Sequence, residues 1–183
     1  MKCNDAAMKQ RVLQKAAQLM EKRGIRGWNM DQLAEETNLA KNTLYRLVNS
    51  KEELMEQIVL RHCKRIYAIL HQILQGNDSY MDTLEKLICA YSELLPAFFS
   101  EIFMEYPRIE EAVERQNTEI RQQVLGYIEQ GIHDGYLRKE LHAEQVFDLL
   151  RAVGLFYSEL GKEERVGKMQ FAFQCVLHGI VQK

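Results

Sequence analysis

Apolar residues recur at spacings of three and four along most of this chain, which is the period of one face of an α-helix. Val12, Ala16, Leu19 and Met20 give the first example, and a longer one runs over residues 54–73. Only two prolines and ten glycines occur among 183 residues, so few positions interrupt a helix. Runs of β-branched residues that would predict strands are missing. We therefore expect an all-α fold.

Turn residues divide the periodic stretches into about nine helices. Glycines follow several stretches, where a left-handed residue commonly ends a helix, and both prolines stand where a helix can begin. The expected helices end at residue 23, cover residues 30–37, 40–48, 51–74 and 79–94, begin after Pro96, and cover residues 107–133, 143–160 and 163–181.

Several classes of protein are not expected from the residue types and their spacing. No apolar run has the roughly 20 residues needed to span a bilayer, and residues 1–5 do not open a signal peptide. The four cysteines form no CxxC pair, which fits a reducing cytoplasm, and the five histidines show no metal-ligand spacing. No nucleophile elbow, phosphate loop or dinucleotide fingerprint occurs. We expect a cytoplasmic protein with no metal and no cofactor, and an enzyme is the least favoured class.

Charge is distributed unevenly along the chain. Residues 1–51 hold ten Lys or Arg and five Asp or Glu, a net charge of +5. The remaining residues hold 14 basic and 21 acidic side chains, a net charge of −7. This asymmetry indicates that only the N-terminal part approaches a polyanion such as DNA.

Residues 29–50 have the pattern of a helix-turn-helix. Asn29 followed by Gln32 predicts a capping box at the start of a short helix, and Asn38 tolerates the left-handed turn that ends it. Ser50 followed by Glu53 predicts a second capping box, at the start of a long helix. Two short helices joined by a tight turn, the second basic and polar, are typical of this DNA-binding motif.

Residues 12–54 resemble the DNA-binding head of the TetR family of bacterial transcriptional regulators. The similarity is carried by NMDQLAEETNLAKNTLY at residues 29–45 and by SKEEL at residues 50–54. The resemblance implies a helix-turn-helix DNA-binding domain at residues 1–50, here called the head. It also implies a ligand-binding and dimerisation domain at residues 51–183, here called the body.

Two sets of head residues are expected to contact DNA. The N-terminal and groove-facing part of the second helix of the motif is where base edges are read, and helix starts suit phosphate oxygens. The expected base contacts are Lys41, Asn42 and Arg46. The expected phosphate contacts are Asn29, Thr43, Tyr45 and Lys51. The alternative is that Asn29 serves only as a cap and that Thr43 and Tyr45 are ordinary surface residues.

The sequence departs from the family pattern in ways that leave the operator sequence open. Ala40 stands where a Ser or Thr cap is common, at a cost of about 1 kcal/mol. Asn38 and Asn42 replace glycines, and Val48 stands where Phe is frequent. Asp31 occupies a position that is often basic, so the preceding helix is not expected to read bases.

The last two expected helices are apolar on more than one side, which indicates a second partner. In the family these helices pair with their copies as a four-helix bundle, and a dimer would place two heads about 34–36 Å apart, on successive major grooves. The expected dimer residues are Val146, Leu150, Val153, Phe156, Tyr157, Met169, Phe173, Val176 and Ile180.

Aromatic residues gather in the middle of the body, where the family keeps an inducer pocket. The expected pocket residues are Tyr67, His71, Tyr91, Phe98, Phe99, Phe103 and Tyr127. His71, Glu93 and Arg121 are candidates for the polar groups that orient an apolar or aromatic ligand. The alternative is that most of these aromatics fill the core.

Together these observations predict a dimeric, ligand-responsive regulator, a repressor rather than an activator, on a roughly palindromic operator. Such a protein would lie with the nucleoid when bound to DNA. The main alternative is a DNA-bound adaptor of similar fold whose body contacts a protein instead of a small molecule. The effector, the operator and the regulated genes are not predicted.

Overall fold

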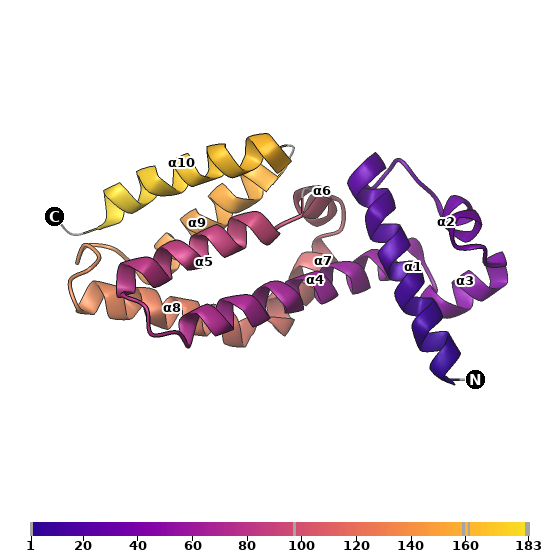
Figure 1. The fold of residues 1–183 in the computed structure, drawn as a ribbon, viewed down its shortest axis with the longest axis horizontal. Coiled ribbons are helices and arrows are strands. Elements are labelled where there is room, and N and C mark those ends of the chain that lie inside the picture. Colours follow the sequence, from indigo (N-terminus) through magenta and orange to yellow (C-terminus); the bar gives the residue numbers. More distant parts are fainter. Residues whose placement is uncertain (1, 97, 159, 161, 182–183) are drawn as a thin grey trace.

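The computed structural model covers residues 2–96, 98–158, 160 and 162–181, without the side chains of residues 2–4, 92–93, 158, 162–163 and 165–166. Ten helices form within these ranges, and no strand is found there, which confirms the all-α fold (Figure 1). They are α1 (Lys2–Arg23), α2 (Met30–Thr37), α3 (Lys41–Val48), α4 (Lys51–Leu74), α5 (Tyr80–Leu94), α6 (Phe98–Glu105), α7 (Pro107–Gln116), α8 (Thr118–His133), α9 (Ala143–Ser158) and α10 (Lys162–Ile180). None of the helices in the described part of the chain is long and apolar enough to cross a membrane.

The head consists of α1, α2 and α3 packed around apolar side chains. Val12 and Ala16 of α1, Leu33 of α2, and Leu44 and Val48 of α3 have no exposed surface. The stripe at spacings of three and four on the first helix therefore faces the core, as its period predicts. Burial of these side chains fixes the angle between α2 and α3.

Helix α4 connects the two ends of the molecule. Figure 1 shows α1–α3 at one end, α5–α10 at the other, and α4 running from the head along the body. Its first turn buries Leu54 and Met55 in the head, and farther along Ile66 and Leu70 are buried in the body. One apolar core thus continues from the head into the body.

A second apolar core holds the outer layer of the body together. Leu84 and Ile88 of α5, Ile128 of α8, and Met169 and Phe173 of α10 are buried in it. In this layer α9 packs against both α8 and α10. The space between this layer and α4 contains the cavity described below.

The stretch expected as one helix over residues 107–133 is two helices, α7 and α8, which accounts for ten helices instead of about nine. The break lies at Asn117, whose backbone has φ −112° and ψ 13°. The hydroxyl of Thr118 donates to the carbonyls of Glu114 and Arg115. A Thr hydroxyl that bonds to the preceding turn in this way bends or weakens a helix, a local effect that apolar periodicity does not report.

Candidate functional site

Helix α3 has one buried side and one exposed side. Leu44 and Val48 are buried against the rest of the head, whereas Lys41, Asn42 and Arg46 are exposed. Tyr45 is 42% exposed, although a large aromatic side chain usually finds cover in a protein of this size. The exposed side of α3 is therefore a polar and basic surface held on a rigid helix.

The turn before α3 depends on Asn38. Its backbone is left-handed, with φ 54° and ψ 40°, and its N–H donates to the carbonyls of Ala34 and Glu35. The hydroxyl of Thr37 donates to the carbonyl of Leu33 at 2.7 Å. The left-handed conformation expected of Asn38 is confirmed, and it sets the direction in which α3 leaves α2.

The helix starts in the head differ in how they are capped. The side chain of Asn29 accepts hydrogen bonds from the N–H groups of Asp31 and Gln32, and the Gln32 amide accepts one from the Asn29 N–H at 3.0 Å. This is the expected capping box. As expected, Ala40 supplies no side-chain bond to α3.

The second expected capping box is only half formed. The hydroxyl of Ser50 accepts from the N–H of Glu53 at 3.1 Å. The carboxylate of Glu53 instead accepts hydrogen bonds from the side chains of Asn49 and Gln57, and the N–H of Ser50 donates to the carbonyl of Val48. A competing donor at each oxygen explains the missing half of the box.

Two basic residues of α3 form ion pairs within the head. Lys41 lies 2.7 Å from Asp31, which raises the pKa of Lys41 through the hydrogen bond and the opposite charge. Arg46 lies 3.3 Å from Asp5 of α1. All four side chains are at least 40% exposed, so water and salt screen both pairs strongly. Both cations can therefore leave their carboxylates at little cost and meet another anion.

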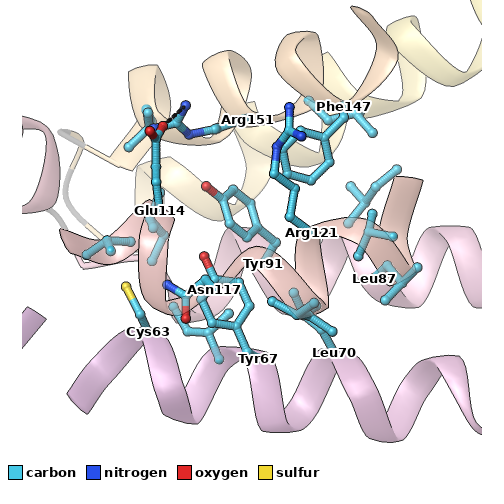
Figure 2. Close-up of a pocket in the computed structure, with 18 of the residues that line it drawn as sticks. Cys63, Tyr67, Leu70, Leu87, Tyr91, Glu114, Asn117, Arg121, Phe147 and Arg151 are labelled. Atoms are coloured by element: carbon cyan, nitrogen blue, oxygen red, sulfur yellow. Dashed lines mark ion pairs between the residues drawn. The ribbon is translucent and has the colours of Figure 1, made fainter. Parts of the chain in front are cut away.

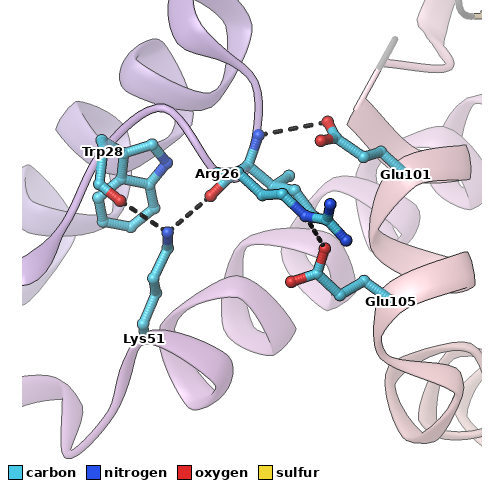
Figure 3. Close-up of polar contacts among 6 residues, drawn as sticks. Arg26, Trp28, Lys51, Glu101 and Glu105 are labelled. Carbon is cyan, nitrogen blue, oxygen red and sulfur yellow. Dashed lines mark hydrogen bonds and ion pairs between the residues drawn. The ribbon is translucent and has the colours of Figure 1, made fainter.

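Lys51 has three contacts inside the protein, at the junction of head and body. Its ammonium group donates to the carbonyl oxygens of Ile25 and Trp28, at 2.6 and 2.7 Å, and lies 4.3 Å from the centre of the Trp28 ring (Figure 3). Desolvation lowers the pKa of Lys51, an effect opposed by the charges of Glu105 and Glu101. The phosphate contact predicted for Lys51 thus competes with these acceptors.

Helix α6 joins the head to the body on the same side. The Glu101 carboxylate accepts a hydrogen bond from the Ile25 N–H at 3.2 Å, and Glu105 pairs with Arg26 at 2.6 Å (Figure 3). The hydrogen bond from Arg26 lowers the pKa of Glu105 below its usual range. The segment after α1 is therefore held by α4 and α6 together.

The body contains a mostly apolar cavity between α4, α5, α7, α8 and α9, with α6 closing one end. The cavity has a volume of about 140 Å³. Leu70, Leu87 and Phe147 line the apolar part, while Glu114 and Arg151 form an ion pair at the other side (Figure 2). Ligand pockets commonly combine apolar walls with a few polar groups in this way.

Two tyrosine hydroxyls reach into this cavity. Figure 2 shows those of Tyr67 and Tyr91 on the side that also carries Glu114 and Asn117. Burial raises the pKa of Tyr67, and it raises the pKa of Tyr91 to about 12 despite the opposing charge of Arg151. Both tyrosines are therefore protonated at neutral pH and are available as neutral donors.

Asn117 contributes a buried amide to the same wall. The residue is 9% exposed, and its side chain makes no cap bond to α8, although Asn117 occupies the cap position. Its Nδ2 atom is buried and has no hydrogen-bond partner among the described residues. A buried donor left in this state costs about 1–3 kcal/mol, so such groups are rare in folded proteins.

The cavity wall includes some of the expected pocket residues. Those that line it are Tyr67, Tyr91, Phe99, Phe103 and the polar candidate Arg121. Glu93 lies outside the described side chains. Glu114, Asn117 and Arg151 also line the cavity and were missed. The available signal for Arg151 is a basic side chain on the mostly apolar stretch over residues 146–157, where Asp148 is the other charged residue. Asn117 gives no signal until the helix break is known.

Three expected pocket residues do not line the cavity. His71 is bonded to Gln123 at 2.8 Å, and Phe98 is buried beside Phe99. Tyr127 donates to the carbonyl of Tyr80 and stacks on its ring at 4.7 Å. Each lies at another angle around its helix from the residues that line the cavity. That angle depends on how the helices pack, which residue type alone does not determine.

The residues expected at the dimer face differ in how far they are buried within this chain. Four are buried inside this one chain, so they offer almost no surface to a second copy: Val146, Met169, Phe173 and Ile180. Four are partly buried: Leu150, Val153, Tyr157 and Val176. Phe156 is 69% exposed. The exposed apolar side of this layer also includes Leu149 of α9 and Phe171 of α10, 46% and 69% exposed.

Comparison with known proteins agrees with the geometry of the head. Residues 12–58 match the family model described as bacterial regulatory proteins of the tetR family. The HTH-type transcriptional repressor KstR2 of Mycolicibacterium smegmatis is 25% identical over 191 residues, covering 97% of this chain and 92% of that protein. The head of this chain, with its helix-turn-helix, therefore matches the tetR family of bacterial regulatory proteins, and nearly the whole chain is similar to a repressor of that kind.

Solved structures share the fold of the whole chain. The ketosteroid transcriptional regulator KstR2 of Mycobacterium tuberculosis has a TM-score of 0.72 at 20% identity, over 96% of this chain and 95% of that one. AibR, solved in complex with isovaleryl coenzyme A and operator DNA, has a TM-score of 0.69 at 16% identity, over 89% and 96%. The arrangement of head and body is therefore common to these proteins.

Proposed function

We propose that the protein is a homodimeric repressor that places α3 of each copy in the major groove of a two-fold symmetric operator. The observation that carries this proposal is the exposed polar side of α3, held by the buried Leu44 and Val48. Lys41, Asn42 and Arg46 would read base edges, and Asn29, Thr43 and Tyr45 would contact phosphates. The relative KstR2 is named a repressor, which supports repression over activation.

The proposed dimer forms through α9 and α10. Leu149 and Phe156 lie seven residues apart on one face of α9, and they and Phe171 of α10 are large apolar side chains left exposed. Exposed apolar surface of this kind commonly marks an interface. A two-fold arrangement would present two copies of α3 to successive major grooves, about 34–36 Å apart. Two half-sites would then contribute to one binding event.

The body is proposed to bind an apolar small molecule that lowers the affinity for DNA. The cavity supports this effector role over the alternative, in which the body is an adaptor for another protein. AibR, which shares the fold, is described with a coenzyme A ester and operator DNA. A coupling of about 1–3 kcal/mol, or roughly 5- to 150-fold in affinity, would suffice.

A route from cavity to head is available through α6. Phe99 and Phe103 line the cavity, whereas Glu101 and Glu105 of the same helix contact the segment after α1. Displacement of α6 by a ligand would therefore act on the head directly. Helix α4 also enters both parts and would carry the motion to α3.

Selection of bound DNA from a random pool tests the proposed operator. We expect enrichment of a two-fold symmetric sequence whose half-site centres lie about 10 base pairs, or a multiple of one helical turn, apart. Enrichment of sequences without symmetry, or no enrichment at all, would contradict the proposal. Loss of operator binding in the presence of compounds that raise the melting temperature would support the effector role over the adaptor.

A further inference from the structure

Asn117 is the polar group of the cavity that most restricts what can bind there. Because Asn117 stands at the N-terminal cap of α8, its side-chain oxygen would ordinarily accept a hydrogen bond from the first turn. It forms no such bond, and Asn117 as a whole is 9% exposed in the wall that also carries Tyr67 (Figure 2). With its Nδ2 unpartnered among the described residues, the amide is a donor for something inside the cavity.

The charged groups of the cavity argue against an anionic ligand. Arg151 is paired with both Glu110 and Glu114, and Arg121 lies 3.5 Å from Glu144. Glu114 itself lines the cavity, so a carboxylate or phosphate would meet a negative charge, while Arg151, the half-buried cation beside it, is already paired with two carboxylates. The uncharged nitrogen and oxygen donors that line the cavity are the amide of Asn117 and the hydroxyls of Tyr67 and Tyr91, and the thiol of Cys63 is a weaker donor.

We infer that the cavity takes a ligand with a compact apolar body and one uncharged acceptor oxygen, a carbonyl above all, which accepts a hydrogen bond from Nδ2 of Asn117. Leu70, Leu87 and Phe147 would contact the apolar body, and Tyr67 is placed to donate to the same oxygen. This inference rests on the proposed effector role of the cavity and adds the chemical class of the ligand.

Three probes that share one ring system test this inference: 1-indanone, indane and indane-1-carboxylate. Titration calorimetry on the full chain would give a Kd for each. Since a neutral hydrogen bond contributes about 0.5–1.5 kcal/mol, we expect the ketone to bind roughly threefold to tenfold more tightly than the hydrocarbon. The carboxylate should bind more weakly than either.

Asn117→Leu should abolish the preference for the ketone while leaving the Kd of indane within about twofold. Ile120→Val is the matched control on the same wall, and it should change the affinities for both probes by the same factor. Thermal unfolding of each variant checks that it is folded. The comparison of probes on the unmodified protein does not depend on any variant.

Equal affinities of the unmodified protein for indanone and indane, or tightest binding of the carboxylate, would overturn the inference and leave the cavity as a ligand site. Retention of the ketone preference in Asn117→Leu would overturn the role given to Asn117. Failure of all three probes to bind would overturn both this inference and the effector role, while DNA binding by the head would stand.

Discussion

The ammonium group of Lys51 donates hydrogen bonds within the protein, to the carbonyls of Ile25 and Trp28. Removing the donor leaves two acceptors that Lys51 partly shields from water. We therefore expect Lys51→Met to lower the free energy of unfolding by about 1–3 kcal/mol, measured by urea denaturation. Lys64→Met is the control, because Lys64 is exposed on the same helix.

The DNA affinity of Lys51→Met, measured against salt concentration, separates this role from a phosphate contact. If the ammonium group stays with its two carbonyls, the salt dependence should match that of the unmodified protein. If the plot of log binding constant against log salt concentration instead becomes shallower by about 1 in slope, Lys51 contacts a phosphate.

Tyr45 presents a hydroxyl on the exposed side of α3. Because phosphate contacts carry no sequence information, Tyr45→Phe should weaken binding to operator and unrelated DNA alike, by roughly fivefold for one hydrogen bond. Fluorescence anisotropy with both DNAs measures this. Tyr136→Phe is the control, since Tyr136 is similarly exposed but lies in the body. Unchanged affinity for both DNAs would remove Tyr45 from the interface.

For individual residues, the sequence predicts helix caps and turns better than it predicts which side chains line the cavity. The capping box at Asn29 and the left-handed turn at Asn38 depend on neighbouring residues, and both are found. The roles of His71 and Asn117 depend on the rotation of helices and on a helix break. Residue type and spacing do not determine those features.

Among the elements, α9 lies unusually close to α5 at Gly154. A Cβ atom at this position would lie 2.5 Å from Cε1 of Tyr91, a ring that lines the cavity. Gly154→Ala should therefore destabilise the protein by about 1–3 kcal/mol through overpacking. Thermal and urea unfolding measure the change.

Gly126→Ala is the matched control for this substitution. Gly126 lies within α8, and nothing lies within 4 Å of the Cβ that it would gain. Relief of the helix penalty of glycine should stabilise this variant by about 0.5–1 kcal/mol. Stabilisation by Gly154→Ala as well would contradict the close contact between α9 and Tyr91.

The sequence predicts where the helices lie better than it predicts which helices pack together. The 3.6-residue period and the turn glycines indicate most of the helices, because amphipathic faces follow from burial. The same apolar period does not say which core a helix faces. Met169 and Phe173 were therefore expected at a dimer interface, although they are buried within the chain.

For the whole molecule, the proposed dimer depends on the exposed side of α9 and α10. Phe156→Glu should convert the dimer to a monomer, because it would place an unpaired charge in an apolar interface. Sedimentation at micromolar concentration measures the change, and operator affinity should fall with it. Met104→Glu is the control, since Met104 is 73% exposed on α6. A monomeric unmodified protein would contradict the proposed dimer.

The proposed function requires α3 to read bases once in each half of a symmetric operator. Parallel selections from a random DNA pool, with the unmodified protein and with Arg46→Ala, test this requirement. We predict the same half-site spacing for both proteins, with base preference lost at one position in each half, at a cost of about 1–3 kcal/mol per contact. An identical preference at every position, or loss at one position only, would contradict the claim.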